Sequence, residues 1–203
     1  MSLFNQEKNF IFVHIPKTGG TSMESLGWIG EGFNKHYDME YFYFTYNKLP
    51  DIDFDNIFKF AFVRDPYTRF ASGVLGHAVP SNKMDLLLGT MGEDESKKID
   101  KKRFTAFTLT HKDKFDDIIA LKPQHSFVTI DGEVVMNFIG RFENLQEDFN
   151  KLCNGLGYGD IELPHLLQGT YTDYDWLYTP ETRKIVTEHY SKDFDLFNYE
   201  RKQ

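Results

Sequence analysis

A short segment near the amino terminus combines a lysine, two glycines and three hydroxyl side chains in the order Lys17-Thr18-Gly19-Gly20-Thr21-Ser22. Paired glycines allow backbone amides to turn inward, because glycine adopts conformations that other residues avoid. A lysine beside inward-facing amides can bind the oxygens of a phosphate or sulfate group without a metal ion. The segment therefore predicts an anion-binding loop, with an ordinary tight turn as the structural alternative.

The residues on either side of this loop predict a strand and a helix. Five of the six residues in Phe10–Ile15 are apolar, which indicates a short buried strand. Beyond the glycines, Thr21 or Ser22 is placed to cap a short helix. The loop is not a Walker A motif, because in that motif the lysine follows the glycines, whereas Lys17 precedes them.

A second stretch, Phe58–Gly73, repeats the order of strand, polar turn and helix. An apolar strand comes first, Asp65 is placed to cap the helix, and Pro66 occupies its first turn. Arg64 therefore lies at the carboxyl end of a strand, and Ser72 lies further along the helix. Open α/β sheets bind nucleotides at the carboxyl ends of their strands. Two such ends with cationic and hydroxyl groups suit a nucleotide that carries two anionic groups.

The sequences HIPKTGGTS and FVRDPYTRFASG resemble the two cofactor motifs of sulfotransferases, specifically the branch of carbohydrate and heparan-type O-sulfotransferases. Enzymes of that family use 3′-phosphoadenosine-5′-phosphosulfate (PAPS), on a fold similar to that of the P-loop kinases. Looser matches follow at IGRFENLQEDF and in the tyrosine-rich residues 163–178, so the resemblance covers most of the chain. In the last match the family usually has polar residues in place of Leu166 and Leu167.

The resemblance implies donor-binding roles for both motifs. The loop would bind the 5′-phosphosulfate, and Arg64 and Ser72 would bind the 3′-phosphate. The segment 163–178 would close over the nucleotide, with contacts from Gly169, Thr170 and Tyr171. The loop residues concerned are Lys17, Thr18, Gly19, Gly20, Thr21 and Ser22.

A histidine is the expected general base. In the resembling family a histidine between the two motifs often has this role, and Lys35-His36 falls where many relatives carry a Lys-His pair. An acceptor hydroxyl must lose its proton as the new bond forms, and imidazole is well matched to that task at neutral pH. We therefore assign catalysis to His36 and to Lys17, which would neutralise the leaving phosphate. A surface histidine is the alternative, with Glu24 or Asp38 as the base.

Together these signals predict one α/β domain over residues 1–203. The expected architecture is a three-layer P-loop-like fold with a short, mostly parallel central sheet flanked by helices. Residues 76–114 include the charged run EDESKKIDKKR, which favours a solvated helix face or a mobile loop. By resemblance, this segment forms the acceptor side of the cleft.

The later part of the chain predicts further elements of this fold. Residues 126–130 and 134–140 indicate strands, and Asp131-Gly132 between them indicates a turn. Leu145 begins an amphipathic pattern that predicts a helix. Thr179 is placed to cap a last helix.

Charge and cysteine usage narrow the functional classes. The net charge of −8, from 23 basic and 31 acidic residues, argues against a general nucleic-acid binder and makes a heavily sulfated polymer an awkward acceptor. Cys153 is the only cysteine, which fits a reducing compartment and rules out a cysteine-based zinc site. We expect PAPS as the co-substrate, no metal ion, and a small-molecule or carbohydrate acceptor.

No signal peptide or membrane anchor can be drawn from the sequence, so we expect a cytoplasmic protein without a membrane partner. Two other functions remain open on the same fold. A P-loop-like kinase would need magnesium ligands and a lysine behind the glycines. A non-catalytic nucleotide-binding module would keep the fold and lack turnover.

Overall fold

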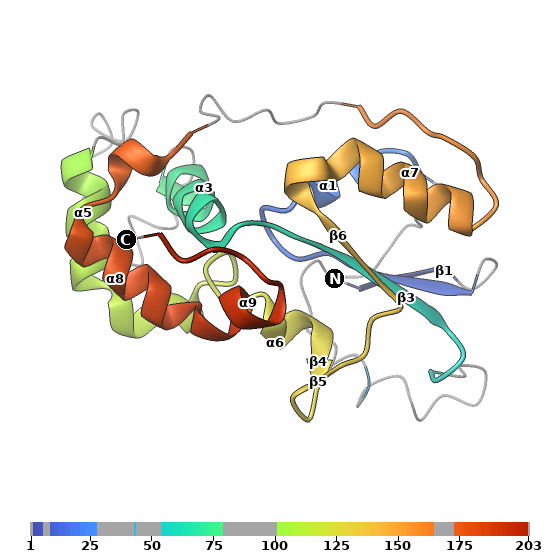
Figure 1. Cartoon of the computed structure of the whole chain (residues 1–203), viewed down its shortest axis with the longest axis horizontal. Coiled ribbons are helices and arrows are strands. Elements are labelled where there is room, and N and C mark those ends of the chain that lie inside the picture. The colour runs from blue at the N-terminus through green and yellow to red at the C-terminus, as the bar shows by residue number, and fades with distance from the viewer. Residues whose placement is uncertain are drawn as a thin grey trace. The chain divides into compact units, whose positions relative to one another are not determined.

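A computed structural model of the chain describes residues 2–5, 9–27, 43, 54–78, 101–164 and 173–202. These residues form two compact units (Figure 1). The first consists of Met1–Arg64 and Pro123–Gln168, and the second of Asp65–Lys122 and Gly169–Gln203. That the 203 residues act as one functional domain stays a prediction.

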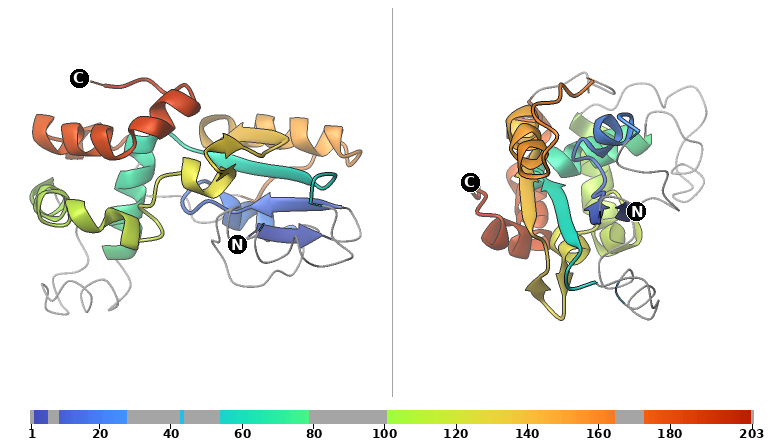
Figure 2. Two further views of the ribbon diagram at one scale, coloured as in Figure 1. Left: turned by 90° about the horizontal axis from the view of Figure 1, so that it is seen from below. Right: turned by 90° about the vertical axis from the view of Figure 1, so that its right-hand side faces the viewer.

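The first unit is built on a four-stranded sheet in the order β1-β2-β3-β6. Strands β2, β3 and β6 run parallel, and β1 pairs antiparallel with β2. Figure 2 shows the four strands side by side in its left view. The strand bounds are Ser2–Asn5 for β1, Phe10–Val13 for β2, Phe58–Val63 for β3 and Phe138–Arg141 for β6. The predicted α/β class with a short, mostly parallel sheet flanked by helices is confirmed.

Two helices, α1 (Gly20–Glu24) and α7 (Leu145–Gly155), cover one face of this sheet. Their apolar side chains pack on a ladder of phenylalanines. Phe12 and Phe60 are paired across β2 and β3, and their stacked ring centroids lie 5.1 Å apart. Because strand side chains alternate between faces, Ile11, Val13 and Ala61 point the other way, and they too are fully buried. Burial on both faces explains why β2 is a continuous apolar run.

A short hairpin projects from the first unit after helix α6 (His125–Val128). Strands β4 (Thr129–Ile130) and β5 (Glu133–Val134) pair antiparallel. Asp131 and Gly132 join them with φ of 51° and 84°, as a two-residue hairpin turn requires, so this turn is confirmed. The strand expected over 126–130 is wrong in its first half, where the chain forms α6 instead. After β6, a 3-10 turn, η2 (Phe142–Asn144), leads into α7.

The second unit is helical. Its helices surround an aromatic core that includes Phe70, Phe104 and Tyr190. Asp65 caps the first helix, since the Thr68 amide donates to its Oδ1 at 2.9 Å, and Thr179 caps α8 in a capping box with Thr182. Both predicted caps are confirmed. The elements are α3 (Pro66–Ala78), α5 (Lys101–Thr110), η1 (Lys112–Asp117), η3 (Asp175–Leu177), α8 (Pro180–His189) and α9 (Ser191–Leu196).

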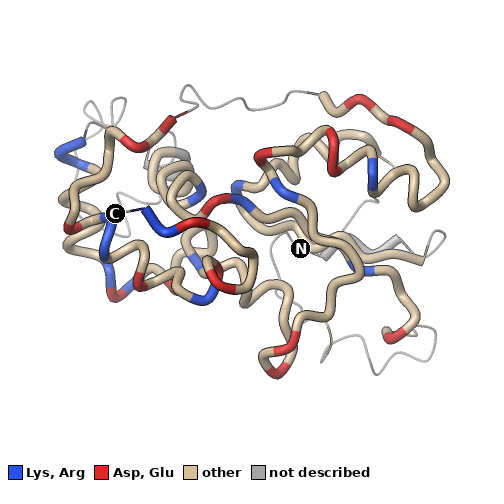
Figure 3. The backbone as a smooth tube through the Cα atoms, in the orientation of Figure 1, with Lys and Arg blue, Asp and Glu red and all other residues tan. Residues whose placement is uncertain are grey.

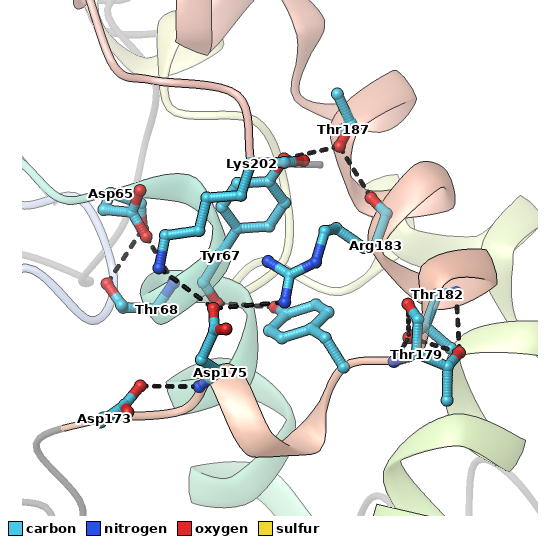
Figure 4. A network of polar contacts seen from close by, with 11 residues as sticks. Asp65, Tyr67, Thr68, Asp173, Asp175, Thr179, Thr182, Arg183, Thr187 and Lys202 are labelled. Atoms are coloured by element: carbon cyan, nitrogen blue, oxygen red, sulfur yellow. Dashed lines mark hydrogen bonds and ion pairs between the residues drawn. The ribbon is translucent and has the colours of Figure 1, made fainter.

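A polar network joins three segments of the second unit (Figure 4). Tyr178 donates its hydroxyl to the Tyr67 carbonyl oxygen at 2.7 Å. The Arg183 guanidinium lies 5.3 Å and 5.0 Å from the rings of Tyr67 and Tyr178 and forms an ion pair with Asp175 at 3.2 Å. Lys202 contacts the same carboxylate at 3.1 Å. The network therefore ties the carboxyl-terminal segment to α3 and α8.

Candidate active site

The anion loop predicted from the sequence lies between β2 and α1. Lys17 and Gly19 both have left-handed backbone conformations, with φ of 71° and 87°. For a lysine this conformation costs about 1 to 3 kcal/mol and is typical of ligand-binding segments. Thr18 is fully buried, and its Oγ1 donates to the Ile15 carbonyl oxygen at 2.8 Å. The hydroxyl of Thr18 thus closes the turn that carries Lys17.

Helix α1 begins differently from the prediction. Its N-cap is Gly19, with no capping side chain, so the caps expected at Thr21 or Ser22 are wrong. The Ser22 amide donates to the Gly19 carbonyl oxygen at 3.1 Å. The first amides of any α-helix have no carbonyl acceptor within that helix. In α1 those groups belong to the glycine pair and Thr21, the residues expected to bind the anion.

Both glycines of the loop are tightly packed. A Cβ atom on Gly19 would lie 2.7 Å from Cδ2 of Leu145, the first residue of α7. A Cβ atom on Gly20 would lie 2.2 Å from Cδ2 of the His14 ring. Real Cβ atoms do not approach other atoms this closely. An alanine at either site would therefore force a neighbouring side chain or the loop itself to shift.

Arg64 lies beside this loop. Its Nη1 donates to the Lys17 carbonyl oxygen at 3.2 Å, and its Cζ lies 4.1 Å from the centre of the Phe142 ring. Its side chain is almost fully buried. The Gln124 side chain fixes the backbone of Arg64 from both sides: the Arg64 amide donates to Oε1 at 2.9 Å, and Nε2 donates to the Arg64 carbonyl oxygen at 2.8 Å.

The contact between Arg64 and Lys17 follows from the sheet. Strands β2 and β3 are parallel neighbours, so their carboxyl ends meet at one edge. Gln124 and Phe142 hold Arg64 there. Phe142 lies within the IGRFENLQEDF match to the family, whereas Gln124 belongs to no motif, periodic pattern or charged cluster of the sequence. Next to Phe142, the Arg141 amide donates to Asp148 Oδ2 at 2.8 Å, which ties the end of β6 to α7.

A buried pair, His14 and Glu24, lies next to the loop. Nδ1 of His14 lies 2.7 Å from Oε1 of Glu24, and the His14 side chain is 5% exposed. The His14 ring stacks on Phe12 with 5.7 Å between the ring centroids. The sequence predicts Glu24 as an alternative base. In the structure its carboxylate contacts His14, a residue to which the sequence assigns no role.

The structure does not test the other predicted site residues. Ser72 is half-buried on α3, in the second unit, and its role in binding a 3′-phosphate stays a prediction. His36 and Asp38 lie outside the described residues. The same holds for the predicted nucleotide contacts Gly169, Thr170 and Tyr171.

Basic residues occur in both units, although the net charge of the chain is −8. Figure 3 shows acidic and basic residues interspersed along the two units. The described residues contain no group of three or more His, Cys, Asp or Glu side chains that could hold a metal ion. Over the same residues, no helix is long and apolar enough to cross a membrane.

The comparison with known proteins identifies the family. A family model described as the sulfotransferase family matches residues 1–200. The chain belongs to the sulfotransferase family. The match includes the Lys17 loop, Arg64 and the segment around Phe142, so the groups assembled at the edge of the sheet are part of a sulfotransferase. No curated protein and no solved structure gave a match.

Proposed function

We propose that this sulfotransferase moves the sulfuryl group of PAPS to an acceptor hydroxyl. The observation that carries the proposal is the contact of the Arg64 guanidinium with the main chain of Lys17. It supports a site with two cationic side chains at neighbouring strand ends, which suits a donor with anionic groups at both its 5′ and 3′ positions.

The proposed reaction is an in-line displacement at sulfur. The acceptor oxygen attacks the sulfur atom, and the bond between sulfur and the 5′-phosphate oxygen breaks. The acceptor proton goes to His36, and the leaving group is adenosine 3′,5′-bisphosphate. Lys17 and the amides at the start of α1 would stabilise the negative charge that grows on the 5′-phosphate.

The other donor contacts are assigned by family resemblance. Arg64 and Ser72 would bind the 3′-phosphate, and residues 169–171 would cover the nucleotide. The acceptor would be a small molecule or a carbohydrate that enters beside residues 76–114. The carbohydrate and heparan-type branch is the one that the loop sequences resemble most.

Nucleotide binding tests the donor without knowledge of the acceptor. A ligand at a hundredfold excess over its Kd stabilises the folded state by about 2.7 kcal/mol, which raises the Tm of a domain this size by about 5 to 10 °C. We expect adenosine 3′,5′-bisphosphate to give this shift without magnesium, and ATP to give little. Strong stabilisation by Mg-ATP and none by the bisphosphate would refute the proposal and favour a kinase.

Turnover separates an enzyme from a binding module. We expect the protein to release adenosine 3′,5′-bisphosphate from PAPS when a panel of hydroxyl acceptors is supplied. Binding of the bisphosphate without release from PAPS by any acceptor would favour a non-catalytic nucleotide-binding module.

A further inference from the structure

The helix that follows the anion loop is too short to hold its own position. Helix α1 has five residues and no capping side chain. A single helical turn is unstable by itself, because its first hydrogen bonds do not repay the ordering of the backbone. The direction of its amides must therefore be set by contacts with the rest of the first unit.

His14 contacts α1 at both of its ends. The imidazole ring lies against Gly20, the first residue of the helix, so closely that a Cβ atom there would be 2.2 to 2.7 Å from three ring atoms. On its other side, Nδ1 lies 2.7 Å from Oε1 of Glu24, the last residue of the helix. With Glu24 ionised, its carboxylate can only accept, so the hydrogen of this bond is carried by Nδ1.

The same ring also closes the loop. His14 follows the last residue of β2, and Gly20 is the first residue of α1, so their contact brings the two ends of residues 15–19 together. The ring itself is held by stacking on Phe12 within the core of the sheet. The imidazole is thus one of the groups that fix the position of the loop relative to β2.

We propose that His14 and Glu24 are positioning residues that set the geometry of the anion loop for the donor. The proposal rests on the function proposed above, since the loop must bind the 5′ end of PAPS for its geometry to matter. Neither side chain needs to touch the donor. Loss of the pair would change the direction of the loop amides and the position of Lys17, and a displacement of about 1 Å at a reacting group can cost roughly a hundredfold in rate.

A double-mutant cycle at Gly20 tests the ring contact. Gly20→Ala should weaken the binding of adenosine 3′,5′-bisphosphate about tenfold or more, because the added methyl group collides with the imidazole. In a His14→Ala background the same change should cost less than about threefold, since the colliding ring is gone. An equal cost in both backgrounds would overturn the proposed role of the ring.

A series at Glu24 tests the hydrogen bond and remains informative if His14→Ala fails to fold. Glu24→Ala should raise the Kd for the bisphosphate and the KM for PAPS about tenfold, while Glu24→Gln, which keeps an oxygen acceptor, should restore most of the loss. The control is Leu152→Ala on α7, which removes a buried core side chain and should lower the Tm with little change in Kd.

The outcomes separate this inference from the proposed function. If the wild-type protein binds no bisphosphate, the donor assignment fails, and the positioning role fails with it. If the wild type binds and Glu24→Ala binds within about twofold of it, the positioning role alone is wrong. If Glu24→Ala and Leu152→Ala lose the same amount of Tm and show the same rise in Kd, the effect of Glu24→Ala is one of stability. That result would also refute the positioning role.

Discussion

The variant Arg64→Ala removes a guanidinium beside the anion loop and leaves the main chain of residue 64 bonded to Gln124. In the folded protein the losses include the hydrogen bond to the Lys17 carbonyl oxygen and the contact with the Phe142 ring. Each is worth about 1 kcal/mol, so these two contacts alone should lower the free energy of unfolding by about 2 kcal/mol. The Tm should drop by about 4 to 8 °C, and the variant should still fold.

The effect of Arg64→Ala on nucleotide affinity should be larger, and it should depend on which nucleotide is bound. A hydrogen bond to a charged group contributes about 1.5 to 3 kcal/mol, which corresponds to a loss of about 10- to 150-fold in affinity. If Arg64 binds the 3′-phosphate, this loss should affect adenosine 3′,5′-bisphosphate, while adenosine 5′-monophosphate, which lacks that group, should bind the variant nearly as it binds the wild type.

Titration calorimetry with the two nucleotides on wild type, Arg64→Ala and Arg64→Lys measures this selectivity. Arg64→Lys keeps a positive charge and should recover part of the affinity for the bisphosphate, but not the planar contact with Phe142. An equal loss for both nucleotides would refute the assignment to the 3′-phosphate. Arg64 would then act on the 5′ end through its contact with the Lys17 main chain.

Three further predictions concern single side chains. Lys17→Ala should lower turnover of PAPS about a hundredfold or more with little loss of stability, since a loop lysine contributes little packing. His36→Ala should bind the bisphosphate normally and transfer sulfate about a hundredfold more slowly. Burial lowers the pKa of His189, so protonation favours the unfolded state, and stability should fall as the pH drops below about 6.5.

Each of these has a direct check. Near-normal turnover by purified Lys17→Ala would disprove its role, and an unchanged rate for His36→Ala would move the base to Glu24, Asp38 or another histidine. For His189, urea unfolding at pH 7 and pH 5.5 should show a smaller loss of stability in His189→Gln than in the wild type. An identical loss in both proteins would contradict the prediction.

Much of the first unit follows from local sequence signals. The strands β2 and β3 are predicted because each is a mainly apolar run that is soon followed by a proline or a capping aspartate. These signals depend on neighbouring residues only, as do the hairpin turn at Asp131-Gly132 and, in the second unit, the helix cap at Thr179. The order of the strands then places Lys17 and Arg64 at one edge of the sheet.

The contacts that hold the site are long-range, and they leave no local signal. Gln124 lies 60 positions after Arg64 and bonds to both its amide and its carbonyl oxygen. The same region explains the failed strand prediction at 126–130. Phe127 and Val128 favour a strand locally, but both are buried in a helical turn that starts directly after Gln124 is fixed at the sheet.

The two glycines of the loop also differ in a way that the sequence alone does not reveal. In the sequence they are equivalent, and together they indicate a flexible turn. In the structure Gly19 has a φ of 87°, so any other residue there would be strained whatever the space around it. Gly20 is helical, where alanine is normally favoured, and the three atoms nearest to an added Cβ all belong to the His14 ring. In a His14→Ala background Gly20→Ala should be tolerated, because the colliding ring is gone. Gly19→Ala should still destabilise the loop in that background, because the backbone strain at residue 19 remains.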